Sequence, residues 1–293
     1  MRANQSVLRG YIGALFVGGA ILGGAAPAQA GVIVSYPSFA GTCGTTLTCV
    51  GSTAESGSVL RVTPATTSQS GAGYSTTPIT LGTNATFSTT FQFQITNPGG
   101  INPADGITFV LAKNSSGLGG NGGSLGYAGV PNSVAIEFDT YNNGGVDLSS
   151  NHVAIDTNGV LTDTNSVNPY GVSTCDFNSG YTQAGCLSNG HIWTATIGYT
   201  GALLTVSAQD GTNPVQTLIN SFPIDIASNL GTDNAFVGFT GSTGAGFENQ
   251  DILNWKLAND TSLAPTVPEP ASIALLGMGL LGLGVARWRK QST

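Results

Sequence analysis

The sequence predicts an all-β protein whose central part folds as one antiparallel β-sandwich. Residues 85–95 and 193–199 alternate between apolar and polar side chains, which is typical of strands with one buried face. Further short runs of β-forming residues are separated by turns rich in Gly, Asn, Ser, Thr and Pro. No amphipathic helical pattern of ten or more residues and no long linker interrupts them. We therefore expect a single sandwich of some twelve strands.

The expected strands follow one another closely along the chain. In order, they cover residues 85–95, 106–111, 134–139, 152–156, 193–199, 202–208, 235–240 and 252–257. Turn residues separate them, and Asn97-Pro98-Gly99-Gly100 is the clearest predicted turn. These patterns alone do not distinguish one kind of sandwich from another.

Charged residues are scarce and unevenly placed. They make up 8% of the 293 residues, whereas an ordinary soluble domain has about 25%. Residues 31–266 contain only Arg61, Lys113 and Lys256 against fourteen acidic residues, which gives a net charge of −11. Such a surface repels phosphate backbones, so nucleic-acid binding is disfavoured.

The N-terminal segment, residues 1–30, has the pattern of a secretory signal peptide. Arg2 and Arg9 precede an apolar stretch, and Ala28-Gln29-Ala30 forms a small-x-small cleavage site. The five glycines in this stretch disfavour the alternative of a buried helix. We expect an exported protein whose mature domain covers residues 31–262.

The C-terminal segment, residues 263–293, resembles the PEP-CTERM sorting signal. Val267-Pro268-Glu269-Pro270 precedes an apolar run from Ala271 to Ala286 and then the basic tail Arg287-Trp288-Arg289-Lys290. The resemblance implies a Gram-negative exporter in which an exosortase cuts near the motif, after transient anchoring in the inner membrane. It also implies release or retention at the cell surface, often with exopolysaccharide. A plain C-terminal membrane anchor is the alternative.

Four cysteines fall into two close pairs. Export to an oxidising compartment favours the disulfides Cys43–Cys49 and Cys175–Cys186, each closing a short polar loop. A zinc site is the alternative, but neither pair has C-x-x-C spacing and His191 lies outside any ligand-like cluster.

Most of the chemistry-bearing residues lie between 137 and 152. Glu137 and Asp139 are two apart on an apolar strand, so their carboxylates share one face and repel each other unless a cation intervenes. The following Gly-rich loop can bring Asn143 and Asp147 back towards them, and His152 begins the next strand.

These residues offer two kinds of metal site. Oxygen ligands suit Ca²⁺, whereas carboxylates with one histidine suit Mn²⁺ or a similar transition ion. The alternative is a solvated acidic turn, but unpaired acids in an apolar run are costly.

Together these features resemble the L-type, legume-lectin-like, lectin family. Four blocks match in the family's order: Ala104-Asp105-Gly106 with the strand after it, Gly122-Gly123-Ser124-Leu125-Gly126-Tyr127, the metal segment from Val134 to Asp156, and Val237 to Gly246 followed by Ile252 to Trp255. The resemblance covers roughly residues 36–258. It implies a concanavalin-A-like jelly roll that binds carbohydrate through two adjacent ions.

The resemblance also implies roles for individual residues. Glu137, Asp139, Asp147 and His152 would hold the transition metal. Asp139, Asn143, Asp147 and the carbonyl of Tyr141 would hold Ca²⁺. The sugar would meet Asp105 after a cis peptide bond, Gly123, Asn143, the ring of Tyr141, and the backbone of Ala245 and Gly246.

Two other functions remain open at this stage. Glycoside hydrolases share the sandwich, but the positions where they carry the second carboxylate are Tyr141 and Asn142 here. Glu55 and Glu248, the remaining glutamates of the mature chain, fall in no motif block, and His191 beside Trp193 is expected at a turn or strand end. A structural matrix protein without sugar affinity is the other alternative. Family members often dimerise, but no feature of this sequence identifies such a surface.

Overall fold

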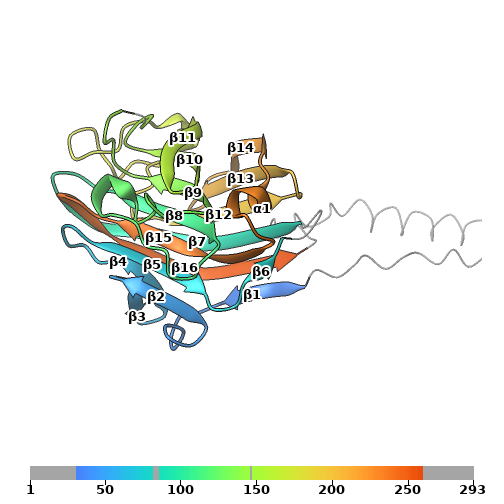
Figure 1. Ribbon diagram of the computed structural model, residues 1–293. Coiled ribbons are helices and arrows are strands. Elements are labelled where there is room, and N and C mark those ends of the chain that lie inside the picture. The colour runs from blue at the N-terminus through green and yellow to red at the C-terminus, as the bar shows by residue number, and fades with distance from the viewer. Residues whose placement is uncertain (1–30, 82–85, 146, 260–293) are drawn as a thin grey trace, which may run out of the picture.

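Two antiparallel sheets lie face to face, as alternation along the chain predicts (Figure 1). The structure, a computed structural model, describes residues 31–81, 86–145 and 147–259. The expected signal peptide and the C-terminal sorting segment lie outside these residues. Among the residues described, no helix is long and apolar enough to cross a membrane.

The first sheet has the strand order β14-β13-β12-β7-β16-β4-β3, with β1 also paired to β16. Its strands are β1 (Val32–Tyr36), β3 (Ala54–Ser56), β4 (Val59–Thr63), β7 (Phe87–Gly100), β12 (Ile192–Tyr199), β13 (Leu203–Asp210), β14 (Gln216–Pro223) and β16 (Gly246–Asn259).

The second sheet has the order β11-β10-β9-β8-β15-β5-β2, with β6 also paired to β15. Its strands are β2 (Leu47–Gly51), β5 (Ser70–Ser75), β6 (Ile79–Thr80), β8 (Gly106–Ala112), β9 (Ser133–Asp139), β10 (His152–Thr157), β11 (Val160–Val167) and β15 (Asn234–Ser242). The helices are short: α1 (Ile226–Leu230) and the 3₁₀ turns Gly122–Ser124 and Pro169–Gly171.

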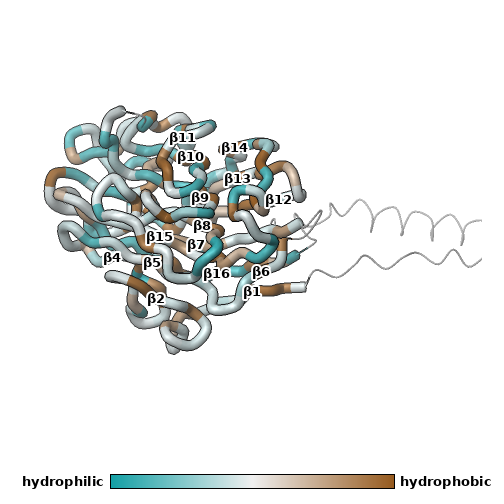
Figure 2. Tube along the Cα trace, viewed as in Figure 1, coloured by the Kyte–Doolittle hydropathy of each residue, from teal (hydrophilic) through white to brown (hydrophobic). Residues whose placement is uncertain are grey.

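Aromatic side chains from both sheets form the core between them. Phe91 of β7 contacts Phe109, Phe138 and Phe239 of the opposite sheet, with its ring centroid 4.9 Å from that of Phe239. The Trp255 indole is buried there as well, and its Nε1–H donates to the Thr89 hydroxyl at 2.8 Å. In Figure 2 the apolar segments accordingly follow the strands, and the connecting loops are mostly hydrophilic.

The second sheet is also covered on its outer face. A smaller cluster that includes Tyr74, Val110, Tyr127 and Val130 packs there. As a result, every residue of β8 and of β9 is buried. The carboxylates of Glu137 and Asp139 on β9 are therefore shielded from solvent, and this burial raises their pKa values.

The predicted turn at Asn97-Pro98-Gly99-Gly100 is wrong. Strand β7 continues to Gly100, which pairs with Gly246 of β16, and the ladder shifts register between Phe247 and Asn249. Asn97 adopts a positive φ of 54°. The turn-forming residues thus make an irregularity within a long strand rather than end it.

The structure has more strands than the twelve expected. Sixteen occur in the described ranges, and the pattern did not reveal β1 to β6, β11 or β14. Strand β5 shows why, since it reads Ser-Gly-Ala-Gly-Tyr-Ser. Its neighbour β15 approaches so closely that a Cβ on Gly238 would lie 2.0 Å from the carbonyl oxygen of Gly73. Glycine is needed for this packing, although it usually indicates a turn.

Both predicted disulfides are confirmed, at Cys43–Cys49 and Cys175–Cys186. The Cys175–Cys186 disulfide itself is buried, since both cysteines are at most 1% exposed. Leu187, which follows this disulfide, packs into the main core. The disulfide is therefore anchored on the core, while residues 177–179 and 182–184 of the loop are exposed.

Candidate functional site

Strands β9 and β10 bring the predicted acidic residues and the histidine together. His152 pairs with Asp139 across the ladder, and Ala154 pairs with Glu137. Glu137, Asp139 and His152 thus lie on one face of neighbouring strands, and all three are at most 3% exposed.

The imidazole of His152 has a defined orientation. Its Nδ1 donates to the Ser149 carbonyl at 2.9 Å, since a carbonyl can only accept. Its Nε2 lies 3.2 Å from the Glu137 Oε1. This arrangement leaves Nε2 as the atom that faces the carboxylates, which is how a metal-binding histidine is usually held.

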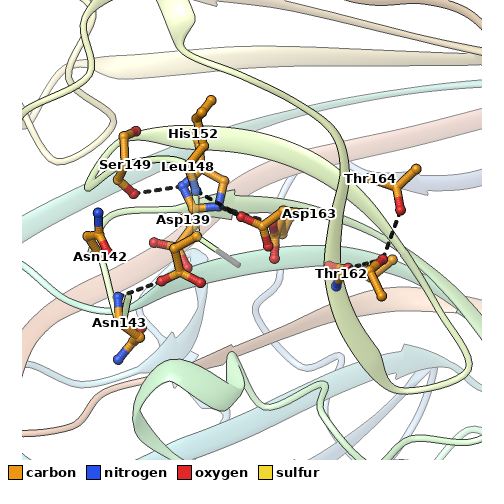
Figure 3. A network of polar contacts seen from close by, with 12 residues as sticks. Asp139, Asn142, Asn143, Leu148, Ser149, His152, Thr162, Asp163 and Thr164 are labelled. Carbon is orange, nitrogen blue, oxygen red and sulfur yellow. Dashed lines mark hydrogen bonds and ion pairs between the residues drawn. The ribbon is translucent and has the colours of Figure 1, made fainter. Parts of the chain in front are cut away.

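Asp163 also reaches this histidine, and the sequence reasoning missed it. Its Oδ2 lies 2.9 Å from the His152 Nε2 and accepts from the Leu148 amide at 3.1 Å (Figure 3). A register shift in the β10–β11 hairpin, where Ile155 pairs with Thr164 and Thr157 with Val160, places Asp163 in a bulge. Bulges redirect side chains in this way, but alternation along the sequence does not reveal them.

The charges of this cluster are not balanced by basic side chains. Burial raises the pKa values of Glu137 and Asp139 well above their ordinary range, despite the opposing effect of His152. Burial alone would lower the pKa of His152, but hydrogen bonds to Asp163 and Glu137 raise it to about 11. In the described part of the chain, the one ion pair that involves a lysine or arginine is Arg61–Asp251.

A cation fits this donor set. One ligand atom each from Glu137, His152 and Asp163 lies within 4.8 Å of the others. Ligands at right angles on bonds of about 2.1 Å lie about 3 Å apart, and the 2.9 and 3.2 Å separations at Nε2 match that spacing. A metal ion would replace the proton that His152 otherwise shares with the two carboxylates.

The loop after β9 folds back as predicted. The Tyr141 amide donates to the Asp139 Oδ1 at 2.7 Å, and the Asn143 amide donates to the Asp147 Oδ2 at 2.5 Å. Burial and the nearby Asp163 charge raise the pKa of Asp147, although the Asn143 hydrogen bond opposes them. Asp147 thus lies beside the cluster, half-buried.

Asp105 forms the second part of the site. A cis peptide bond joins it to Ala104, as the resemblance implied, and its amide donates to the Ser242 carbonyl at 3.0 Å. The side chain is 3% exposed, and its Oδ2 has no hydrogen-bond partner. Burial and the Asp147 charge raise the pKa of Asp105 to about 7.

Two predicted sugar-binding residues lie beside this carboxylate. The Asn143 side chain lies near Asp105 and lowers the pKa of its carboxyl group, in opposition to burial. A Cβ on Gly123 would lie 2.4 Å from the Asn143 side-chain carbon and oxygen, so the amide group packs directly on the Gly123 backbone. Asp105, Gly123 and Asn143 therefore meet at one place.

In the loop before β16, the residue that approaches the Asp105 carboxylate is Gly244, whereas the sequence predicted contacts from Ala245 and Gly246. Gly244, which the prediction did not name, lies against Asp105, since a Cβ on Gly244 would be 3.3 Å from the Asp105 Oδ2. Gly246 is buried against the backbone of Asn102, while Ala245 is exposed. A Cβ on Gly246 would also lie 2.8 Å from the side chain of Ala104, which precedes Asp105 in the chain.

Glu248 is a further residue that no motif revealed. It is fully buried, and its carboxyl oxygens accept from the hydroxyls of Thr140 (2.6 Å) and Ser188 (2.8 Å). Burial raises its pKa to about 7. His191 lies elsewhere, at the start of β12, where its Nδ1 is 2.7 Å from the Asp210 carboxylate.

Comparison with known proteins identifies the family. The legume lectin domain matches residues 33–272, which is most of the chain. The chain belongs to the legume lectin family. Members of this family are carbohydrate-binding proteins rather than enzymes, and they typically bind Ca²⁺ and Mn²⁺. The PEP-CTERM protein-sorting motif matches residues 266–290, which indicates export with exosortase processing and sorting to the surface.

Individual relatives agree with this assignment. Agglutinin-2 of Cladrastis kentukea is 33% identical over 58% of this chain, and the chain spans 57% of that protein. The lectin alpha chain of Lablab purpureus is 30% identical, with 66% of this chain and 68% of that protein covered.

Solved structures show the same fold. The basic winged bean lectin, solved with the Tn antigen, has 26% identity and a TM-score of 0.64 over 78% of this chain and 97% of its own. The Lotus tetragonolobus seed lectin has 26% identity and a TM-score of 0.62, over 79% and 100%.

Proposed function

We propose that this legume lectin family member is an exported, metal-dependent lectin that recognises glycans or exopolysaccharide at the bacterial cell surface. The observation that carries the proposal is the meeting of Asp105, Gly123 and Asn143 beside a buried cluster of carboxylates and an imidazole.

The donor groups around Asp105 suit sugar hydroxyls. A hydroxyl both donates and accepts, so an ionised carboxylate, a side-chain amide and a backbone N–H are complementary partners for a pair of them. The buried Oδ2 of Asp105 lacks a partner within the protein. A bound sugar hydroxyl would supply one. The ring of Tyr141 is the proposed stacking surface, and the backbone of Ala245 and Gly246 the proposed rim.

Two ions would hold these groups in place. Glu137, Asp139, Asp147 and His152 are the proposed ligands of the transition metal, and Asp163 adds a further carboxylate beside them. The side chains of Asp139, Asn143 and Asp147 with the Tyr141 carbonyl are the proposed Ca²⁺ ligands. The ions would supply positive charge that stabilises these four closely spaced carboxylates.

Each part of the chain has a proposed role in export. Residues 1–30 would direct export, residues 31–262 would form the lectin domain, and residues 263–293 would anchor the protein in the inner membrane until an exosortase cleaves it. Mature protein would then reside at the surface of a Gram-negative cell or in its surroundings.

A glycan array tests the proposal. The protein with Ca²⁺ and Mn²⁺ is expected to bind a defined group of neutral glycans. Asp105→Asn should abolish that signal, because an amide replaces one acceptor oxygen with a donor, while the control Asp233→Asn on an exposed loop should retain it. Absence of any glycan signal from metal-loaded protein, or full binding by Asp105→Asn, would contradict the proposal.

A further inference from the structure

Strand β16 carries two polar side chains into the interior of the sandwich at the end that lies near the candidate site. Glu248, Gln250 and Ile252 are alternate residues of this strand, and all three are 0% exposed. Ile252 packs into the main core, as Trp255 and Leu257 do further along the strand. Burial of a carboxyl group and a side-chain amide is costly unless each is hydrogen-bonded. The partners of Glu248 and Gln250 therefore indicate what these two residues do.

Both side chains reach across to the second sheet. The Glu248 Oε1 accepts a hydrogen bond of 2.6 Å from the hydroxyl of Thr140, the residue directly after β9. Gln250 donates from Nε2 to the carbonyl of Ser242, the last residue of β15, at 2.8 Å. Strand β16 belongs to the first sheet, whereas β9 and β15 lie on either side of β8 in the second sheet. The two contacts thus join the sheets on both sides of β8.

Asp105, directly before β8, lies between these two partners. Its carbonyl accepts from the Thr140 amide at 2.9 Å, and its own amide donates to the Ser242 carbonyl at 3.0 Å. A carbonyl oxygen has two lone pairs, so Ser242 can accept from Asp105 and Gln250 together. All five residues, with Glu248, are at most 3% exposed. The backbone N–H and C=O of Asp105 are therefore each held by a residue that β16 holds in turn.

We propose that Glu248 and Gln250 are positioning residues for sugar binding, which fix the Asp105 carboxylate by holding the two partners of its backbone. This inference rests on the proposed lectin function and deepens it. Both side chains are fully buried, so they act through Thr140 and Ser242 rather than on the sugar. A carboxylate whose orientation is already fixed loses less conformational entropy when it meets a pair of sugar hydroxyls.

Ser188 allows a comparison within the same carboxyl group. Its hydroxyl donates to the Glu248 Oε2 at 2.8 Å, so Thr140 and Ser188 make the same kind of hydrogen bond to the two oxygens of one side chain. Thr140 is also bonded to Asp105, whereas Ser188 belongs to the segment that follows the Cys175–Cys186 disulfide. Loss of sugar affinity on the Thr140 side alone would therefore indicate positioning rather than general stabilisation.

Calorimetric titration with saturating Ca²⁺ and Mn²⁺ tests the proposal. The probes are mannose, galactose, glucose, N-acetylglucosamine and the glycan with the strongest array signal, and those that the wild type binds are used for the variants. Thr140→Val keeps the shape of the side chain but removes the hydroxyl, and should weaken binding by about tenfold or more, as expected for a lost hydrogen bond to a charged group. Thr140→Ser restores the hydroxyl and should bind within about threefold of the wild type.

Ser188→Ala is the matched control. It should keep the sugar affinity within about threefold, although guanidinium unfolding should show a loss of stability similar to that of Thr140→Val. Glu248→Met and Gln250→Met remove the polar atoms from side chains of similar length, and each should weaken sugar binding about tenfold. Thr140→Val added to Glu248→Met should cost less than about threefold more, because the two changes break the same contact. If Glu248→Met does not fold, the Thr140 and Ser188 variants decide.

Three results would contradict the positioning role while the wild type binds sugar. They are wild-type affinity in Thr140→Val, an equal loss in Ser188→Ala, or failure of Thr140→Ser to restore binding. If the metal-loaded wild type binds none of the probes, the proposed lectin function itself fails, and the positioning role fails with it.

Discussion

The buried carboxyl of Glu248 makes the stability of this domain depend on pH. Glu248 connects Thr140, at the end of the metal strand, to Ser188, behind the disulfide loop. Its pKa of about 7 in the folded protein lies above the ordinary value of 4.5, chiefly because burial disfavours the charged form. Between these two pH values the folded state binds more protons than the unfolded state. The free energy of unfolding therefore falls as the pH rises through this window.

The size of this effect follows from the shift. A difference of roughly 2.5 pKa units corresponds to about 3 kcal/mol, at about 1.4 kcal/mol per unit. Glu248→Gln is close in shape and carries no charge, so it removes the titration. Relative to the wild type, the variant should gain about 3 kcal/mol between pH 4.5 and pH 8.

Guanidinium unfolding at several pH values, with saturating Ca²⁺ and Mn²⁺, measures this difference. Glu55→Gln is the control, since the Glu55 carboxylate also accepts two hydrogen bonds, from the Gly41 and Cys43 amides, but these lower its pKa. That variant should be less stable than the wild type above about pH 4.5, and this difference should shrink as the pH falls below 4.5. Parallel stability curves for Glu248→Gln and the wild type would refute the reasoning about Glu248.

Three further predictions concern the site and the core. Gly123→Ala places a methyl group 2.4 Å from the Asn143 amide and should weaken sugar binding at least tenfold in calorimetry; unchanged affinity would show that this contact is not needed. Asp163→Asn should weaken Mn²⁺ binding by about tenfold to a hundredfold, measured by titration of metal-free protein, whereas Asp233→Asn should not; equal affinities would remove Asp163 from the site. Phe91→Ala should cost about 3 to 5 kcal/mol in guanidinium unfolding because it opens a cavity between the sheets, and a loss below about 1 kcal/mol would contradict the packing described.

The sequence predicted those parts of the fold in which alternation or continuous apolar runs were strong. The strand expected at 193–199 is β12, and the one expected at 134–139 is β9. Strand β12 is buried on one face and its residues alternate between apolar and polar, whereas β9 is buried on both faces and is mostly apolar. The polar strand β11 and the Gly-rich strand β5 escaped prediction because their roles depend on neighbours distant in the chain.

Some residues of the candidate site could likewise be predicted from the sequence, and others could not. Glu137, Asp139 and His152 could be placed together because strand periodicity fixes which side chains share a face. Asp163 could not, since its position depends on a bulge that changes register, and Gly244 could not, since only its backbone approaches Asp105.

The most direct test of the account is the dependence of sugar binding on metal. The glycan with the strongest array signal is titrated into protein dialysed against EDTA, and again after Ca²⁺ and Mn²⁺ are restored. Without a cation, repulsion among Glu137, Asp139 and Asp147 should disorder the loop that carries Asn143. The account predicts that binding is lost in EDTA and returns with the ions. Undiminished affinity in thoroughly metal-free protein would contradict it.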